Sequence, residues 1–163
     1  MRYTVSIELA LPRGRAVQLL ADPAYLPMWL RGLVTHEPLT GSHGQVGCES
    51  RVVLETGGRR MEAVETITRR EPADLTDIPA DRVVHFEREI VAEGMWNAAR
   101  DRLTEAGPRT TLWESENEYR FGSLPMRLMA PFMGGAFRKA SRQHMQDFQA
   151  FAERGVDVRA AQD

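Results

Sequence analysis

His144 is the residue of this sequence best placed to take part in chemistry. It lies in an otherwise apolar stripe near the C-terminus, between Phe137 and Phe148. An imidazole among apolar side chains either makes a hydrogen bond to a core neighbour or faces a cavity, where it could contact a ligand or exchange protons. The sequence leaves both interpretations open.

Residues 110–121 place further polar groups on one face of a predicted strand. Every second position is charged: Glu114, Glu116, Glu118 and Arg120. Because these side chains must face water, the alternate set faces inward. That set is Trp113, Ser115, Asn117, Tyr119 and Phe121. Its three hydrogen-bonding groups either fix the strands to one another or orient a ligand.

Two neighbouring segments add candidates for acid–base chemistry. Residues 95–104 alternate so that Asn97 and Asp101 share a face, although Trp96 on the other face leaves this register open. His85 alternates with Phe86 and could point either way. The candidate general acids and bases for a cyclisation or dehydration are His144, Tyr119, Asp101 and His85. Because cavities lined by a few polar groups more often bind than react, we favour binding and assign no catalytic residue.

The sequence indicates neither a metal site nor a cofactor. His36-Glu37 does not continue to HExxH, because Thr40 stands where the second histidine would be. The histidines are scattered, so a metal site made by His36, His85 and His144 is not expected. Cys48 is the single cysteine, which excludes an internal disulfide and a CxxC pair.

Charge and hydropathy limit the partners. The 21 basic and 23 acidic side chains give a net charge of −2, which does not indicate nucleic-acid binding. Arg138, Lys139 and Arg142 are interpreted as the solvated face of a helix, with too little charge alone to indicate RNA or anionic lipid. No run approaches the roughly 18 apolar residues of a membrane span, so we expect no stable membrane insertion and a cytoplasmic location. Lys139 is the only lysine beside many arginines, which suggests a GC-rich bacterial genome.

Period-two patterns and turn residues predict the order of the elements. Residues 3–9 form a strand, Pro12 opens a short helix, and Asp22-Pro23 separates it from a second short helical piece over residues 25–30. Gly57-Gly58 is a predicted hairpin turn. The remaining predicted strands are residues 33–39, 46–56, 59–70, 82–91, 95–104 and 110–121. About seven strands joined mostly by tight turns indicate an antiparallel sheet.

The end of the chain has the clearest helical pattern. Its inward stripe is Met133, Phe137, Ala140, His144, Phe148 and Phe151. Pro131 and Gly134-Gly135 should bend or break the helix near its start, next to a methionine-rich segment, 124–133, that suits either a cavity mouth or a packed helix entrance. Gly155 is a suitable end, and residues 156–163 are expected to form a flexible tail.

These elements predict an α+β fold in a single domain over residues 1–155. One face of the antiparallel sheet must be covered, and only the C-terminal helix is long and apolar enough to cover it. A strongly twisted sheet around one helix seldom fills completely, so an internal cavity is expected.

The chain resembles the START-like (SRPBCC) superfamily, and within it the polyketide cyclase/dehydrase branch. The opening strand, the proline-led helix and the stretch DPAYLPMWL at residues 22–30 are similar to the start of that branch, and residues 131–153 to its final helix. The resemblance implies a helix-grip fold that binds lipids, polyketides, steroids or other bulky apolar molecules. It implies no catalytic set, because these motifs are packing and turn residues.

Three functions remain open from the sequence. The first is a carrier or sensor that binds a bulky hydrophobic or amphipathic small molecule, the second an enzyme of the cyclase/dehydrase type, and the third a protein-interaction module with a vestigial cavity. A monomer or weak homodimer is expected. The predicted ligand-binding residues are Trp29, Asn97, Trp113, Ser115, Asn117, Tyr119, Met133, Phe137, His144 and Phe148.

Overall fold

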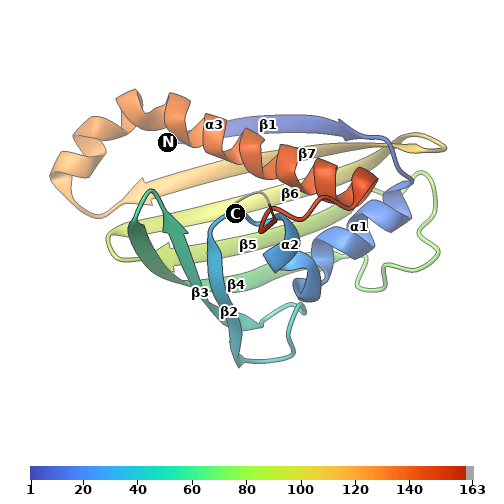
Figure 1. The fold of residues 1–163 in the computed structure, drawn as a ribbon, viewed down its shortest axis with the longest axis horizontal. Coiled ribbons are helices and arrows are strands. Elements are labelled where there is room, and N and C mark those ends of the chain that lie inside the picture. The colour runs from blue at the N-terminus through green and yellow to red at the C-terminus, as the bar shows by residue number, and fades with distance from the viewer. Residues whose placement is uncertain (161–163) are drawn as a thin grey trace.

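The computed structural model describes residues 1–160 of the chain. A seven-stranded antiparallel sheet curves around a long helix (Figure 1). In chain order the elements are β1 (Arg2–Leu9), α1 (Arg13–Ala21), a 3-10 turn (Pro23–Tyr25), α2 (Leu26–Trp29), β2 (Leu33–Thr40), β3 (Glu49–Thr56), β4 (Arg59–Glu71), β5 (Val84–Ala92), β6 (Met95–Gly107), β7 (Thr110–Phe121) and α3 (Leu124–Arg154). The predicted helix-grip architecture is confirmed.

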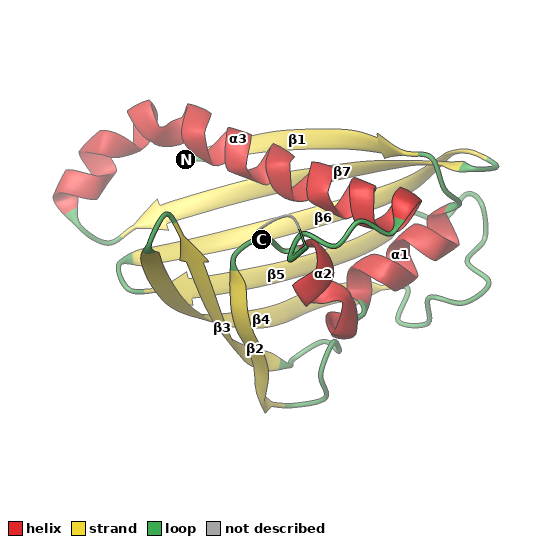
Figure 2. Cartoon of the chain, viewed as in Figure 1, coloured by secondary structure: helices red, strands yellow, loops and turns green. Residues whose placement is uncertain are grey.

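The order of the strands in the sheet is β1-β7-β6-β5-β4-β3-β2. Neighbours in the chain therefore pair with each other, except that the first strand lies beside the last, with Tyr3 opposite Asn117. Gly57 and Gly58 form the two-residue turn between β3 and β4 with φ of 59° and 75°, a conformation that glycine adopts without steric cost. Register shifts in the β2–β3 and β4–β5 pairs mark bulges, which increase the local twist, and β2 and β3 curl toward α3 (Figure 2).

Helix α3 begins and ends with capping residues. The Ser123 hydroxyl accepts a hydrogen bond from the Met126 N–H, and Gly155 takes the left-handed conformation at the end. The helix is continuous through Pro131, so the expected interruption is a bend and not a break, and the bend is visible near the start of α3 in Figure 1. α3 packs on β1, β7 and α2. It therefore covers one side of the concave face.

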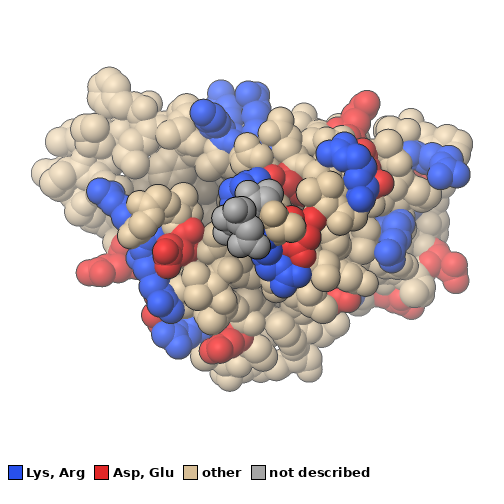
Figure 3. Space-filling view, viewed as in Figure 1, with Lys and Arg blue, Asp and Glu red and all other residues tan. Residues whose placement is uncertain are grey.

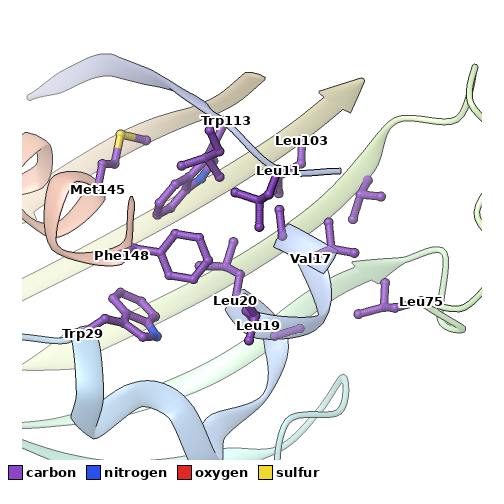
Figure 4. Close-up of a cluster of buried hydrophobic side chains, with 14 of the residues drawn as sticks. Leu11, Val17, Leu19, Leu20, Trp29, Leu75, Leu103, Trp113, Met145 and Phe148 are labelled. Carbon is purple, nitrogen blue, oxygen red and sulfur yellow. The ribbon is translucent and has the colours of Figure 1, made fainter. Parts of the chain in front are cut away.

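The core is centred on three aromatic side chains (Figure 4). Phe148 of α3 is fully buried and meets Trp29 of α2 and Trp113 of β7 edge to face, with ring centroids 5.2 and 5.3 Å apart. This geometry is favourable for aromatic pairs. The cluster joins the sheet, α2 and the second half of α3.

Two expected boundaries differ in the structure. β3 begins at Glu49 and not at residue 46, because the Cys48 N–H turns back to the Gln45 carbonyl. Residues 156–160 pack back on the molecule where a flexible tail was expected: Val158 is buried and its N–H donates to the Met28 carbonyl. The rest of the expected tail, residues 161–163, lies outside the described residues.

Candidate functional site

Polar side chains from five strands form a continuous row across the concave face of the sheet. We call this row the polar band. Its members are His36 of β2, Glu65 of β4, Arg88 of β5, Asp101 of β6 and Trp113 of β7. The pleat explains the arrangement, because each of these residues alternates with neighbours that face the outer side of the sheet.

Asp101 is the most buried charged residue of the polar band, with 1% of its surface exposed. One carboxylate oxygen accepts a hydrogen bond from Trp113 Nε1 at 3.0 Å, and the other accepts one from Arg88 Nη2 at 3.2 Å. Arg88 also lies 3.6 Å from a Glu65 oxygen. The Arg88 guanidinium thus stands between two buried carboxylates, and its Nε–H is buried without a partner among the described residues.

Glu65 is linked to solvent through two histidines. His36 Nε2 lies 3.0 Å from Glu65 Oε1, and His36 Nδ1 lies 2.9 Å from Nε2 of His43, which is on the exposed loop after β2. Burial would raise the pKa of Glu65, but the hydrogen bond from His36 and the charge of Arg88 outweigh it and lower the pKa. Glu65 is therefore ionised at neutral pH.

His144 on α3 lies near enough to the polar band for the charge of Arg88 to act on its imidazole. Burial lowers the pKa of the imidazole; Asp147 acts in the opposite direction, while the charges of Arg88 and Arg31 also lower it. Its ring forms no hydrogen bond with any described residue. His144 is thus a neutral imidazole at pH 7, half-buried, with its nitrogens free to meet another group.

One turn further along α3, Asp147 fastens the helix to the loop before β2. Its carboxylate accepts two hydrogen bonds from Arg31, at 3.0 and 2.9 Å, and one from Gln143 at 3.1 Å. Ala140, on the same side of the helix as Phe137 and His144, is exposed. The inward side of α3 is therefore uncovered at Ala140 and anchored at Asp147.

Two small cavities lie beside the core. A cavity of about 10 Å³ lies between α1, β5 and β6, and one of about 20 Å³ lies beside the polar band, lined by His36, Glu65 and Arg88. Each is about the size of a single water site. A larger hollow of about 230 Å³ opens on the outside, between α2, β2 and the turn at Val158. A bulky ligand would require the concave side to open further.

Comparison with known proteins identifies the fold. Neither a family model nor a curated protein sequence matches the chain. Among solved structures, TTHA0849 from Thermus thermophilus superposes with a TM-score of 0.74 at 11% identity, over 95% of this chain and 99% of that one. The Zhui aromatase/cyclase from Streptomyces sp. R1128 gives a TM-score of 0.71 at 14% identity, over 94% of both chains. Norcoclaurine synthase from Thalictrum flavum, in complex with dopamine and hydroxybenzaldehyde, gives 0.65 at 13% identity, over 94% of this chain and 87% of that one.

The chain shares the helix-grip fold of these solved structures. At these identities the likeness concerns the fold, and the site must be argued from the residues of this chain.

The inward polar residues of β6 and β7 in this helix-grip protein contact neighbouring groups of the protein itself. Asn117 Nδ2 donates to Ser115 Oγ at 3.1 Å, and Asn97 Nδ2 donates to the Glu118 carbonyl at 3.1 Å. Tyr119 packs edge to face on Phe137, with ring centroids 4.7 Å apart, and burial raises its pKa. The Asn97 contact joins β6 to β7 and fits the interpretation that polar residues fix the strands, while the Asn117–Ser115 bond lies within β7. A role in binding stays a prediction for each of them.

The other predicted ligand-binding residues divide into two groups. Trp29, Trp113 and Phe148 are buried against one another in the core, so a ligand could reach them only by displacing that packing. Met133 and Phe137 are half-buried on the first half of α3. This second group borders the uncovered part of the helix-grip interior.

The four candidate acids and bases are not brought together. His85 lies on the outer face of the sheet, opposite Arg102 and close to Arg69 and Glu71; burial and then the Arg69 charge lower its pKa. Asp101 is held by Trp113 and Arg88. Tyr119 packs on Phe137, and the His144 ring forms no hydrogen bond with a described residue.

Sequence reasoning missed His36, Glu65 and Arg88. The signal for two of them was present: Glu65 stands between Ala63 and Ile67, and Arg88 between Phe86 and Ile90, at inward positions of alternating strands. A charged residue at such a position indicates a buried partner. His36 could be placed only once the curl of β2 was known.

Proposed function

We propose that this protein binds a bulky amphipathic small molecule between α3 and the concave face of the sheet, as a carrier or sensor. The observation that carries the proposal is the polar band. A row of polar and charged side chains facing a hydrophobic helix is costly to bury, and packing alone does not require it. Together with the His144 imidazole, which has no hydrogen-bond partner among the described residues, it offers a polar handle inside an otherwise apolar interior.

The uncovered side of α3 supplies the entrance in this proposal. Ala140 is exposed although it lies on the inward side of the helix, between Phe137 and His144. Because the two cavities beside the core are small, a bulky ligand in this proposal enters by parting α3 from the curled strands.

A bulky residue at Ala140 tests the proposal. Ala140→Trp should fill the space at the entrance and reduce ligand binding at least tenfold, while Ala106→Trp, at the exposed end of β6, should leave it unchanged. Binding is measured as the rise in melting temperature with a library of fatty acids, sterols and aromatic polyketides, and as mass added in native mass spectrometry of protein purified from its own cells.

Two results would overturn the proposal. One is that no compound raises the melting temperature and repeated preparations carry no bound molecule. The interior would then be filled by side chains, and a protein-interaction module with a vestigial cavity would be the better explanation. If a compound binds Ala140→Trp as tightly as the wild type, the binding site lies elsewhere.

A catalytic role is the second candidate, and the state of His144 favours it. A neutral imidazole without a hydrogen-bond partner can act as a general base. With a compound that binds, His144→Ala should abolish turnover and leave affinity within a few-fold if the protein is an enzyme. Unchanged turnover would exclude this histidine as the base, and loss of folding would identify it as a core residue.

A further inference from the structure

The start of α3 presents large apolar side chains to solvent. Leu124, Leu128 and Phe132 are 68%, 67% and 81% exposed, and Met129 is 53% exposed. At intervals of four residues the first three lie along one side of the helix. We call these four residues the apolar end. Figure 3 shows it as a broad surface without charged side chains, at the upper left over the start of α3.

The charge of the surrounding segment has one sign. Residues 122–146 contain four basic residues and no acidic one: Arg127, Arg138, Lys139 and Arg142. All four are exposed, and none forms an ion pair with a described residue. Arg142 follows Leu124 by 18 residues, about five helical turns, and therefore lies on the same side of the helix. Along one side of α3, the exposed apolar residues are thus followed by cations.

This combination selects among possible partners. A second copy that pairs through this same segment would offer its cations no acidic partner, because residues 122–146 contain no acidic residue. A nucleic acid would use the cations and leave the exposed leucines and phenylalanine without a role. An anionic lipid surface uses both, because apolar side chains enter the boundary of the acyl chains while cations meet the headgroups.

We propose that the apolar end of α3, together with Arg138, Lys139 and Arg142, docks reversibly on an anionic lipid surface. The charge of the basic cluster by itself is too small to indicate lipid; the exposed apolar end beside it is the added observation. The inference goes beyond ligand binding and does not depend on it. It concerns peripheral contact, since no helix among the described residues is long and apolar enough to cross a membrane.

Vesicle co-sedimentation tests the inference. The wild type should sediment with vesicles that mix phosphatidylcholine and phosphatidylglycerol, and not with vesicles of phosphatidylcholine alone. Added salt should weaken binding, because it screens the cations. Leu128→Ser/Phe132→Ser should abolish sedimentation. Arg138→Gln/Lys139→Gln/Arg142→Gln should weaken it on the order of a hundredfold, since each cation near an anionic surface contributes about 1 kcal/mol.

Matched variants elsewhere on the surface serve as controls. Leu39→Ser/Val46→Ser removes two apolar residues that are each 55% exposed, and Arg15→Gln/Arg102→Gln/Arg109→Gln removes three exposed cations. Both should bind vesicles like the wild type. Melting temperatures of all variants show that they are folded, and ligand-induced stabilisation without vesicles should be equal in all of them.

Three outcomes would overturn the inference: no sedimentation of the wild type, equal binding to neutral vesicles, or control variants that lose as much binding as the α3 variants. A dimer in size-exclusion chromatography with light scattering that Leu128→Ser/Phe132→Ser dissociates, without vesicle binding, would assign the surface to a second copy instead. Since ligand stabilisation is measured separately, each of these results leaves the proposed function standing or falling by its own test.

Discussion

Arg88 connects the two buried carboxylates of the polar band, and the cost of removing it follows from that position. Its side chain is 17% exposed, and those of Asp101 and Glu65 are 1% and 11% exposed. Without the guanidinium, two carboxylates would remain in a poorly solvated interior. A buried charge that loses its partner destabilises the folded state by far more than the intact pair stabilises it.

We therefore expect Arg88→Met to lower the free energy of unfolding by about 3 to 5 kcal/mol in urea denaturation at pH 7. Arg51→Met is the control, because Arg51 forms a bidentate ion pair with Glu62 on the exposed side of β3. Its loss should lower the free energy of unfolding much less, because solvent screens this pair. Similar losses for both variants would show that burial of the polar band has no special energetic consequence.

At the scale of elements, α3 is held in two different ways. Its second half packs with Phe148 in the core and is fastened by Asp147 to Arg31, while its first half carries the exposed apolar end. Pro131 lies near the C-terminal limit of the exposed apolar end, before the anchored part of the helix. This division is what both the entrance and the lipid contact require.

The Asp147→Asn variant tests the anchor. The amide keeps the volume of the side chain but loses the charge and one acceptor oxygen, so unfolding free energy should fall by about 1 to 2 kcal/mol, limited by the exposure of Arg31. The rate of amide hydrogen exchange at residues 30–33 should rise, because the loop is no longer fastened to α3. Unchanged exchange in that loop would show that Asp147 does not fasten it.

The sequence predicted elements better than sites, and the strands show why. Residues 110–121 alternate between charged and uncharged side chains, which set both the strand and its inward face, and Thr110–Phe121 is the strand observed. Alternation around His85 gave conflicting signals, because Glu87 and Glu89 mark its own face as solvent-exposed while Arg88 places a charge on the opposite face. Pairing across five strands, which assembles the polar band, depends on register and curl that no local pattern contains.

For the molecule as a whole, ion pairs on the outer face join the first strand to the last two. Glu118 of β7 accepts hydrogen bonds from Arg2 of β1, Arg120 of β7 and Arg100 of β6. The hydrogen bonds from Arg2 and Arg120 lower the pKa of Glu118 to about 2. The folded state thus holds the proton less tightly than the unfolded chain, whose ordinary value is 4.5.

The lower pKa of Glu118 in the folded state sets the direction in which stability changes with pH. The stabilisation by Glu118 is fully present above pH 4.5 and is lost as the pH falls through about 2. Glu118→Gln should therefore be less stable than the wild type at pH 7, with a difference in unfolding free energy that shrinks between pH 4.5 and 2. Glu114→Gln, on the same face of β7 and without an ion pair to a described residue, is the matched control for the loss of a surface carboxylate. A Glu118→Gln effect that is constant with pH would contradict the assignment.

The pairing of β1 with β7 has a consequence for how the chain is made. Strands β2 to β6 can each find a neighbour soon after they leave the ribosome, but β1 must wait until residue 121 has been synthesised before its partner is complete. During that interval the first strand and the open edge of β6 are unpaired, and such edges invite contact with other chains. The protein is therefore most exposed to aggregation just before its last quarter emerges, when nascent-chain chaperones would have the greatest effect on yield.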